Sequence, residues 1–281
     1  MTKIAVLGTG LLGSGMVENL RAKGQEVRVW NRSREKLAPL TAKGAVAGSD
    51  PADTVRGCAR VHLILAEDTA VDAVIAALRP GLGAGVPILD HSTNLPQKVA
   101  ARSAALRGAG VNYLHAPVFM SPQNAREGSG LMLIAGPHAA VEPLLPSLST
   151  MTGKVWHCGE RVDLAAAHKL AGNGVLIGLA GVLGDLFAMG RNNGLDAAQV
   201  LSLFEVFKPG AALPMIGQRV AQAGDTPPSF ELTMARKDVR LMLETAGKAE
   251  LCVLPGVAAA MDRALAAGRG KDDFAVFARP R

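Results

Sequence analysis

The stretch that decides the fold is Ile4-Ala5-Val6-Leu7-Gly8-Thr9-Gly10-Leu11-Leu12-Gly13. A short apolar run ends at a glycine turn, and an amphipathic segment follows from about Leu11 to Lys23. This order predicts a strand, a tight turn and a helix. Gly8 permits the turn, Gly10 leaves room for a pyrophosphate, and Gly13 lets the helix pack on the strand. Because N–H groups at a helix start attract anions, the stretch predicts a dinucleotide-binding turn.

Strand-like and helical segments alternate as far as about residue 160. The expected strands are 4–7, 25–30, 61–66, 86–89, 111–114, 131–135 and 155–157, with helices at 68–78 and 96–108. Such alternation predicts a parallel sheet with helices on both faces. Beyond this point the expected segments are all helical, at 162–192, 195–207, 214–223, 233–249 and 255–267. The predicted fold is an α/β, Rossmann-type doubly wound sheet domain over 1–160. An all-α domain over 161–281 follows, joined by a long helix.

Charge and composition narrow the class of partner. The net charge is +6, which suits nucleic acid, an anionic membrane surface or a phosphorylated small molecule. No Lys/Arg-rich run and no interleaved aromatic residues occur, so nucleic acid is not expected. Cys58, Cys158 and Cys252 lie far apart with no metal-ligand spacing, so we expect reduced, mostly buried thiols and no metal site. The N-terminus lacks a signal-peptide pattern, and a cytosolic protein is expected.

The long helix has to be weighed as a membrane span. Leu170 to Gly184 contains no charge, but the run is shorter than the ~20 residues that a span needs, and Asn173 interrupts it. We therefore expect no membrane and a helix buried between domains or subunits. Gly174 and Gly178, one turn apart, would let another backbone approach. A homodimer or homotetramer is expected, with this helix near the interface.

The end of the second strand predicts the choice of cofactor. NAD-preferring sites usually carry an acidic residue here for the ribose hydroxyls. This chain has Asn31-Arg32-Ser33-Arg34 instead, which offers a guanidinium and neutral donors to a 2′-phosphate. The alternative is that Arg32 and Arg34 are only solvated loop charges. The pattern favours NADP(H).

At this point the ordered motifs resemble the β-hydroxyacid dehydrogenase family, which includes 3-hydroxyisobutyrate dehydrogenase and glyoxylate/succinic semialdehyde reductases. Beside the glycine turn, the resemblance is carried by Asp90-His91-Ser92-Thr93-Asn94-Leu95-Pro96, Ala166 to Asn173, and Lys237-Asp238. It covers nearly the whole chain, and the ordered set is more specific than any one motif.

The resemblance implies a role for each matching residue. Lys169 would be the essential acid/base, and Asn173 would help to hold the reacting oxygen. The implied cofactor contacts are Gly8, Gly10, Leu11, Leu12, Gly13, Asn31, Arg32, Ser33, Leu65, Ala66, Glu67, Thr93 and Lys237. The implied substrate contacts are Ser92, Phe119, Met120 and Ser121.

The chemistry of Lys169 is reasonable on its own terms. Lys169 and Asn173 are four residues apart and share one face of a helix. An ammonium group there could polarise a carbonyl and supply the proton that reduction requires. Desolvation should lower the pKa of Lys169. The alternative is a solvated surface lysine, which a helix with so few charges disfavours. His168 points about 100° away on a helix, so packing is the expected role for that neighbour.

The substrate loop departs from the family pattern. The family reads D-A-P-V-S-G-G, whereas this chain reads His115-Ala116-Pro117-Val118-Phe119-Met120-Ser121. Three alternatives stay open: a small carboxylate held by Ser121, Asn124 and His115, a less polar aldehyde or ketone packed on Phe119 and Met120, or an imine. Imine reductases share this architecture but generally lack the lysine. A different class of function is a non-catalytic NADPH-binding module, which retention of Lys169, Asn173 and Lys237 argues against.

Overall fold

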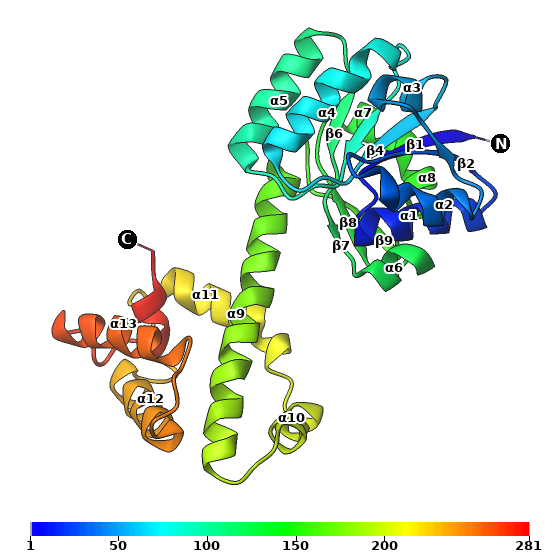
Figure 1. Ribbon diagram of the computed structural model, residues 1–281. Helices are drawn as coiled ribbons and strands as arrows, with labels where there is room; N and C mark the ends of the chain where they lie inside the picture. Colours follow the sequence, from blue (N-terminus) through cyan, green and yellow to red (C-terminus); the bar gives the residue numbers. More distant parts are fainter. Residues whose placement is uncertain (1, 281) are drawn as a thin grey trace. The chain divides into compact units, whose positions relative to one another are not determined.

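The computed structural model describes residues 2–280, and its first unit is built on a six-stranded parallel sheet (Figure 1). The strand order is β3-β2-β1-β4-β5-β6, with consecutive neighbours parallel. The strands are β1 (Lys3–Leu7), β2 (Glu26–Trp30), β3 (Val46–Ala47), β4 (Arg60–Leu63), β5 (Ile88–Asp90) and β6 (Tyr113–His115). The order reverses between β1 and β4, which is where such sheets open a ligand crevice.

Helices cover both faces of this sheet, as the alternating sequence predicted. Side chains of β1 alternate between the faces: Ile4 and Val6 pack with α1 (Leu11–Ala22), whereas Ala5 and Leu7 pack with α4 (Asp68–Leu78) and α5 (Pro96–Gly108). These four side chains are fully buried. Short helices fill the remaining connections, namely η1 (Arg34–Leu37), α2 (Ala38–Thr41), α3 (Pro51–Val55), η2 (Arg79–Gly81), α6 (Pro122–Glu127), α7 (His138–Val141), η3 (Glu142–Leu144) and α8 (Leu145–Leu148).

The last strands of this unit form a second sheet, which corrects the expectation of one parallel sheet. The order is β7-β8-β9, from β7 (Val118–Phe119), β8 (Leu131–Ile134) and β9 (Lys154–His157), and the β7–β8 pair is antiparallel. The chain turns at Ala116-Pro117, and a single bridge between His115 and Ala135 is where the two sheets meet. A two-residue strand such as β7 is too short to show a periodic signal.

The second unit is helical, as predicted. By contacts between residues the chain divides into Met1–Asn173 and Gly174–Arg281, so the division lies within α9 (Leu164–Asn192). The sequence placed the boundary at 160/161, ahead of this helix. Residues at the start of α9 belong with the first unit because Ala165 and Ala166 are buried in its core clusters.

Capping residues and glycines set the bounds of the remaining helices. They are α10 (Ala197–Val206), η4 (Pro209–Ala212), α11 (Leu213–Gln222), α12 (Leu232–Ala246), α13 (Leu254–Ala266) and η5 (Phe274–Ala278). The sequence began α10 two residues early because Asp196, with Gln199, forms a capping box that fixes the start. It ran α12 too far because Gly247 has a φ of 61°. A core that includes Leu232, Met261 and Val276 holds this unit together.

One expectation about burial is corrected. All three cysteines are free thiols, but only Cys58 is buried; Cys158 is half-buried and Cys252 is exposed. Within residues 2–280, α9 is the one helix whose length and composition would suffice to cross a membrane, and little of it is buried. Length and composition alone do not separate a membrane helix from one that packs against another protein surface.

Candidate active site

The glycine turn lies at the carboxyl end of β1, where the sequence placed it. Gly8 has a φ of 98°, and a Cβ there would lie 2.1 Å from the Ile64 carbonyl oxygen. A Cβ on Gly13 would lie 2.0 Å from the Gly8 oxygen, so α1 can approach β1 only with glycine there. Gly10 has no side chain to cap α1, and its backbone lies beside open space in the part of the chain described here. The helix start can therefore offer N–H groups to a phosphate.

A cleft of about 690 Å³ opens beside this turn. Ten of the predicted cofactor residues line it: Gly8, Gly10, Leu11, Leu12, Asn31, Arg32, Ser33, Leu65, Ala66 and Glu67. Gly13 supports the turn from beneath and is not part of the lining. Lys36 also lines the cleft and was missed by the sequence analysis. Its position four residues after Arg32, in a short helix, is the signal that could have found it.

Asn31 serves the turn rather than an open donor site, which corrects part of the sequence interpretation. Its Oδ1 accepts from the Thr9 N–H at 3.1 Å, and its Nδ2 donates to the Ser33 carbonyl at 2.9 Å. The amide therefore ties the end of β2 to the glycine turn. Arg32 is exposed at the cleft, and Arg34 instead donates to the Ser49 carbonyl at 2.9 Å. Arg32 and Lys36 are the cations left facing this cleft.

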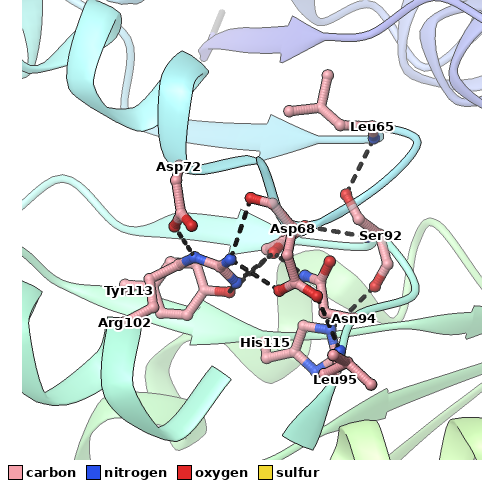
Figure 2. Close-up of polar contacts among 10 residues, drawn as sticks. Leu65, Asp68, Asp72, Ser92, Asn94, Leu95, Arg102, Tyr113 and His115 are labelled. Carbon is pink, nitrogen blue, oxygen red and sulfur yellow. Dashed lines mark hydrogen bonds and ion pairs between the residues drawn. The ribbon is translucent and has the colours of Figure 1, made fainter. Parts of the chain in front are cut away.

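Ser92, in the loop after β5, links the loop after β4 to the end of β6 (Figure 2). Its Oγ accepts from the Leu65 N–H at 2.9 Å, and its carbonyl accepts from Nε2 of His115 at 2.9 Å. Ser92 is buried, so its hydroxyl holds the Leu65 loop in place, whereas Thr93 beside it is exposed. Thr93 is not part of the cleft lining.

Buried polar side chains hold the Ser92 loop in place through hydrogen bonds. The Asp90 carboxylate accepts from Ser92 N–H at 3.0 Å, Asn94 Nδ2 at 2.7 Å and the Tyr113 hydroxyl at 2.7 Å. Arg102 pairs with Asp68 at 2.8 Å at the start of α4 (Figure 2). Burial and the Asp90 charge raise the pKa of Tyr113 well above its usual value, so the hydroxyl stays a donor.

The lysine predicted to be catalytic is half-buried and has defined partners in the first unit. Its Nζ donates to Oδ1 of Asn173 at 2.9 Å and lies 4.1 Å from the centre of the Phe119 ring. This confirms the shared helix face. Burial lowers the pKa of Lys169, as expected for an ammonium removed from water. The ring of His168 packs against Trp156, with centroids 4.9 Å apart, which agrees with the packing role expected for it.

The side chains that could donate hydrogen bonds to a substrate carboxylate already have partners. Ser121 and Asn124 form a capping box at the start of α6, with Ser121 Oγ and Asn124 Oδ1 2.7 Å apart. The Asn124 Nδ2 donates to Ser129 Oγ at 2.9 Å. His115 is buried, and burial lowers its pKa. Of the three alternatives for the substrate, a carboxylate held by these side chains is therefore disfavoured, because each already has a partner within the first unit. Phe119 and Met120 are the half-buried members of the segment.

Lys237 and a pair of histidines lie outside the cleft lining. Lys237 lies in the second unit, on α12, where it pairs with Asp238 at 2.8 Å. The sequence analysis missed a buried pair of stacked imidazoles, His62 on β4 and His91 after β5, with ring centroids 5.1 Å apart. A histidine inside the apolar strand segment Val61-His62-Leu63 is the signal that could have found it. Within residues 2–280, no cluster of three or more His, Cys, Asp or Glu has a metal-binding arrangement.

Comparisons with known proteins agree with this geometry. Residues 3–159 match the NAD binding domain of 6-phosphogluconate dehydrogenase, and residues 164–280 match the NAD-binding domain of NADP-dependent 3-hydroxyisobutyrate dehydrogenase. Glyoxylate/succinic semialdehyde reductase 2 of Arabidopsis thaliana is 30% identical over 246 residues, covering 85% of this chain and 68% of that protein. The 3-sulfolactaldehyde reductase of Escherichia coli (strain K12) is 26% identical, covering 99% and 95%.

A solved structure shows the same fold along the whole chain. The imine reductase of Streptomyces aurantiacus superposes with a TM-score of 0.87 at 24% identity, over 99% of this chain and 98% of that one. At this identity the likeness concerns the fold. Two matched domains, in the order expected from the sequence, define the assignment: the chain belongs to the β-hydroxyacid dehydrogenase family and is an NAD(P)-dependent oxidoreductase.

Proposed function

We propose that this protein transfers hydride between NADP(H) and a small aldehyde, ketone or β-hydroxy acid, with Lys169 as the general acid/base. The observation that carries the proposal is the placement of the Lys169 ammonium. It is half-buried, bonded to Asn173 and seated on the Phe119 ring. Burial together with the aromatic contact distinguishes it from an exposed lysine such as Lys23, which also bonds an asparagine four residues away. The same unit carries the dinucleotide cleft.

The cleft favours the phosphorylated cofactor. Arg32 and Lys36 line it together, and Ser33 adds a hydroxyl beside them. Charge-assisted hydrogen bonds from a guanidinium suit a 2′-phosphate. The ribose end carries no acidic residue in the segment Asn31-Arg32-Ser33, where an acid would repel that phosphate. We therefore assign NADP(H) rather than NAD(H) as the working cofactor.

The side chains divide the chemistry between them. When bound, the cofactor supplies or accepts the hydride. Lys169 donates the proton to the carbonyl oxygen in reduction and takes it back in oxidation. Asn173 positions the amine by accepting a hydrogen bond from it through Oδ1. The amide N–H of Asn173 can donate a hydrogen bond to the reacting oxygen. Burial lowers the pKa of Lys169, which makes the ammonium a stronger acid toward the carbonyl oxygen.

The test is NADPH consumption over a panel of small semialdehydes, aldehydes and ketones. Lys169→Met, which keeps the length and removes the charge, should lower kcat by about 10²- to 10⁴-fold, the usual worth of a general acid. Lys98→Met, at an exposed position on α5, is the control and should leave the rate unchanged. Tight NADPH binding without turnover of any carbonyl or imine would identify a non-catalytic NADPH-binding module instead.

Imine reduction is the second candidate, favoured by the apolar Phe119 ring beside the amine. An iminium carbon accepts hydride as a carbonyl does, but it already carries its proton. Lys169→Met should therefore abolish ketone reduction while sparing the reduction of a preformed cyclic imine. If the cyclic imine is turned over faster than every carbonyl in the panel, this candidate replaces the first.

A second copy of this chain is the proposed macromolecular partner. Within the second unit, α9 exposes Val175, Leu176, Ile177 and Leu179, each at least 44% accessible. Gly174 and Gly178 beside them leave the helix backbone open among the residues described. An apolar surface of this kind marks a protein or membrane contact. A homodimer or homotetramer would cover it, with the protein working in the cytosol, where its free thiols stay reduced.

A further inference from the structure

Phe119 occupies a defined place against α9. Its ring lies 4.1 Å below the Lys169 ammonium. A Cβ on Gly172, three residues further along the helix, would lie 2.3 Å from Cζ of the ring and 2.8 Å from Cε1. Because residues three apart lie on the same helix face, the ring spans the face from Lys169 to Gly172. Only glycine at position 172 leaves room for it.

The backbone holds the ring in this position. Phe119 pairs with Leu131 in the β7–β8 ladder, and its side chain packs with Leu133, Ala135 and Ala165. Met120, the next residue, packs instead against the cluster that Leu12 and Ile64 of the cofactor cleft also contact. Alternate side chains of the segment thus serve two clusters. The surface next to the amine is therefore aromatic.

The polar side chains of this loop already have hydrogen-bond partners. His115 Nδ1, which has none among the residues described, is an acceptor in the neutral ring and offers a carboxylate no donor. Ser121 and Asn124 satisfy each other at the start of α6, Asn124 also bonds Ser129, and His115 bonds the Ser92 carbonyl. In the proposed reaction the Lys169 ammonium bonds the reacting oxygen, so a carboxylate elsewhere on the Phe119 ring would lose water without gaining a donor from this loop. Burying a charge without such donors is costly. An uncharged group would lose nothing comparable.

We propose that Phe119 is a specificity-determining residue, which selects uncharged carbonyl compounds over carbonyl acids, and that Gly172 makes its position possible. This inference rests on the proposed reductase function and names its substrate class. The ring also acts on the amine: a cation over an aromatic face is stabilised. Phe119 therefore keeps Lys169 protonated and pointing along the ring while burial opposes the charge.

The first experiment compares two four-carbon aldehydes, butanal and succinic semialdehyde, by kcat/KM with NADPH. The wild type should prefer butanal at least tenfold. Phe119→Ser, which opens the space and adds a hydroxyl, should shift this ratio toward the acid by tenfold or more. Phe119→Leu, the apolar control, should retain the preference. A wild type that prefers succinic semialdehyde, or a Phe119→Ser ratio within twofold of wild type, would overturn the inference.

The second experiment uses Gly172 as a probe of the ring. Gly172→Ala alone should displace the ring and reduce kcat at least tenfold. In the Phe119→Ser background the same change should cost less than threefold, because no ring remains to be displaced. Phe119→Leu should also move the alkaline limb of the pH profile to lower pH, since the ammonium loses its aromatic face. Additive effects of the two substitutions, or an unmoved limb, would contradict this arrangement.

Failure of the reductase function can be told apart from failure of this inference. If neither aldehyde consumes NADPH, the proposed function fails. The selectivity is then measured by binding, with butyramide and butyrate as uncharged and charged probes on the NADP⁺-saturated protein. Butyramide should bind more tightly to wild type, and Phe119→Ser should reduce or reverse that difference. Tighter binding of butyrate than of butyramide by the wild type would contradict the inference, whether or not the protein turns over a substrate. Cofactor binding and thermal melts check that each variant folds.

Discussion

The chemistry of this protein depends on the hydrogen-bond and packing partners of single side chains. Lys169 has one polar partner, Asn173, and one aromatic face, Phe119. The helical period predicted the first contact, because residues four apart on a helix meet. It could not predict the second, because Phe119 comes from another element. The same holds for Asn31, whose amide is used in the glycine turn rather than left for a ligand.

The lowered pKa of Lys169 predicts the pH dependence of catalysis. Burial lowers that pKa below its ordinary value of 10.5. Carbonyl reduction needs the ammonium form, so kcat/KM should be constant below this pKa and fall as pH rises through it. Alcohol oxidation needs the free amine and should rise over the same range. The measurement is a pH–rate profile in both directions. An alkaline limb at or above 10.5, or one unchanged by Lys169→Met, would contradict the assignment.

Arg32 predicts the preference between cofactors. Removing a hydrogen-bonded charge pair costs about 1.5–3 kcal/mol, so Arg32→Ala should weaken NADPH binding by about 10- to 100-fold. NADH binding should change less than threefold, because NADH has no 2′-phosphate. Arg34→Ala is the control, since Arg34 bonds the Ser49 carbonyl. Fluorescence titration with both cofactors measures the difference. Equal losses for NADPH and NADH would show that Arg32 does not contact the phosphate.

At the scale of elements, neighbouring strands are joined by buried polar groups as well as by the sheet. His62 on β4 accepts from Arg60 Nε at 3.0 Å, and its Nδ1 meets His91 Nε2 at 2.8 Å. His91 Nδ1 meets the Ala116 carbonyl at 2.6 Å. Arginine can only donate, so both imidazoles carry hydrogen on Nδ1 and the chain runs in one direction. It ends at Ala116, within the segment 115–121.

This histidine pair predicts acid-sensitive stability. Burial, the neighbouring imidazole and Arg60 lower the pKa of His62 well below 6.5, and burial lowers that of His91 to about 4. The unfolded chain binds these protons near 6.5, so stability is full above that pH. It is lost as pH falls toward 4, by roughly 3 kcal/mol for His91.

The measurement is chemical denaturation between pH 7 and pH 4, with histidine ring NMR titration of the folded protein. The ring signals of His62 and His91 should stay neutral below pH 5. His62→Gln should flatten the pH dependence of the unfolding free energy, whereas His138→Gln, at an exposed position, should leave it as in wild type. Histidine signals that all titrate near 6.5 would exclude the buried chain.

At the scale of the whole molecule, the chain leaves an apolar helical surface exposed. Exposed apolar residues gather on α9 at Val175, Leu176 and Ile177, and Ile177 is 73% accessible. Burial of such side chains is worth about 1.5–3 kcal/mol each. A chain of 29.0 kDa with this surface should therefore associate in solution.

Light scattering during size exclusion tests this association. The wild type should have at least twice the mass of one chain, and Ile177→Glu should shift it toward one chain, because a carboxylate in an apolar interface is costly. Gln97→Glu on α5, an exposed polar position, should leave the mass unchanged. A monomeric wild type would overturn the prediction. Recovery of the protein with lipid vesicles would instead assign α9 to a membrane surface.

The sequence predicted most of the framework because local rules govern it. The glycine turn needs Gly8 and Gly13 whatever lies around it, since backbone atoms fill the space where a Cβ would be. The helices over 68–78 and 96–108 have the expected bounds. The sequence missed β7 and the second sheet, because a two-residue strand has no period and its pairing depends on residues further along the chain. It also assigned Ser121 and Asn124 to a ligand, when they bond each other.

The amino-acid sequence by itself determined the Rossmann turn, the alternation of elements, the helical second half and the shared face of Lys169 and Asn173. Each follows from spacing along the chain, which short-range sterics and hydrogen bonding control. Only the tertiary structure decided which polar groups are free, since Ser121, His115 and Asn31 find partners that their neighbours in sequence do not reveal. It also placed Phe119 against Lys169 and Gly172. Such contacts arise from the packing of a strand on a helix, and no local pattern encodes them.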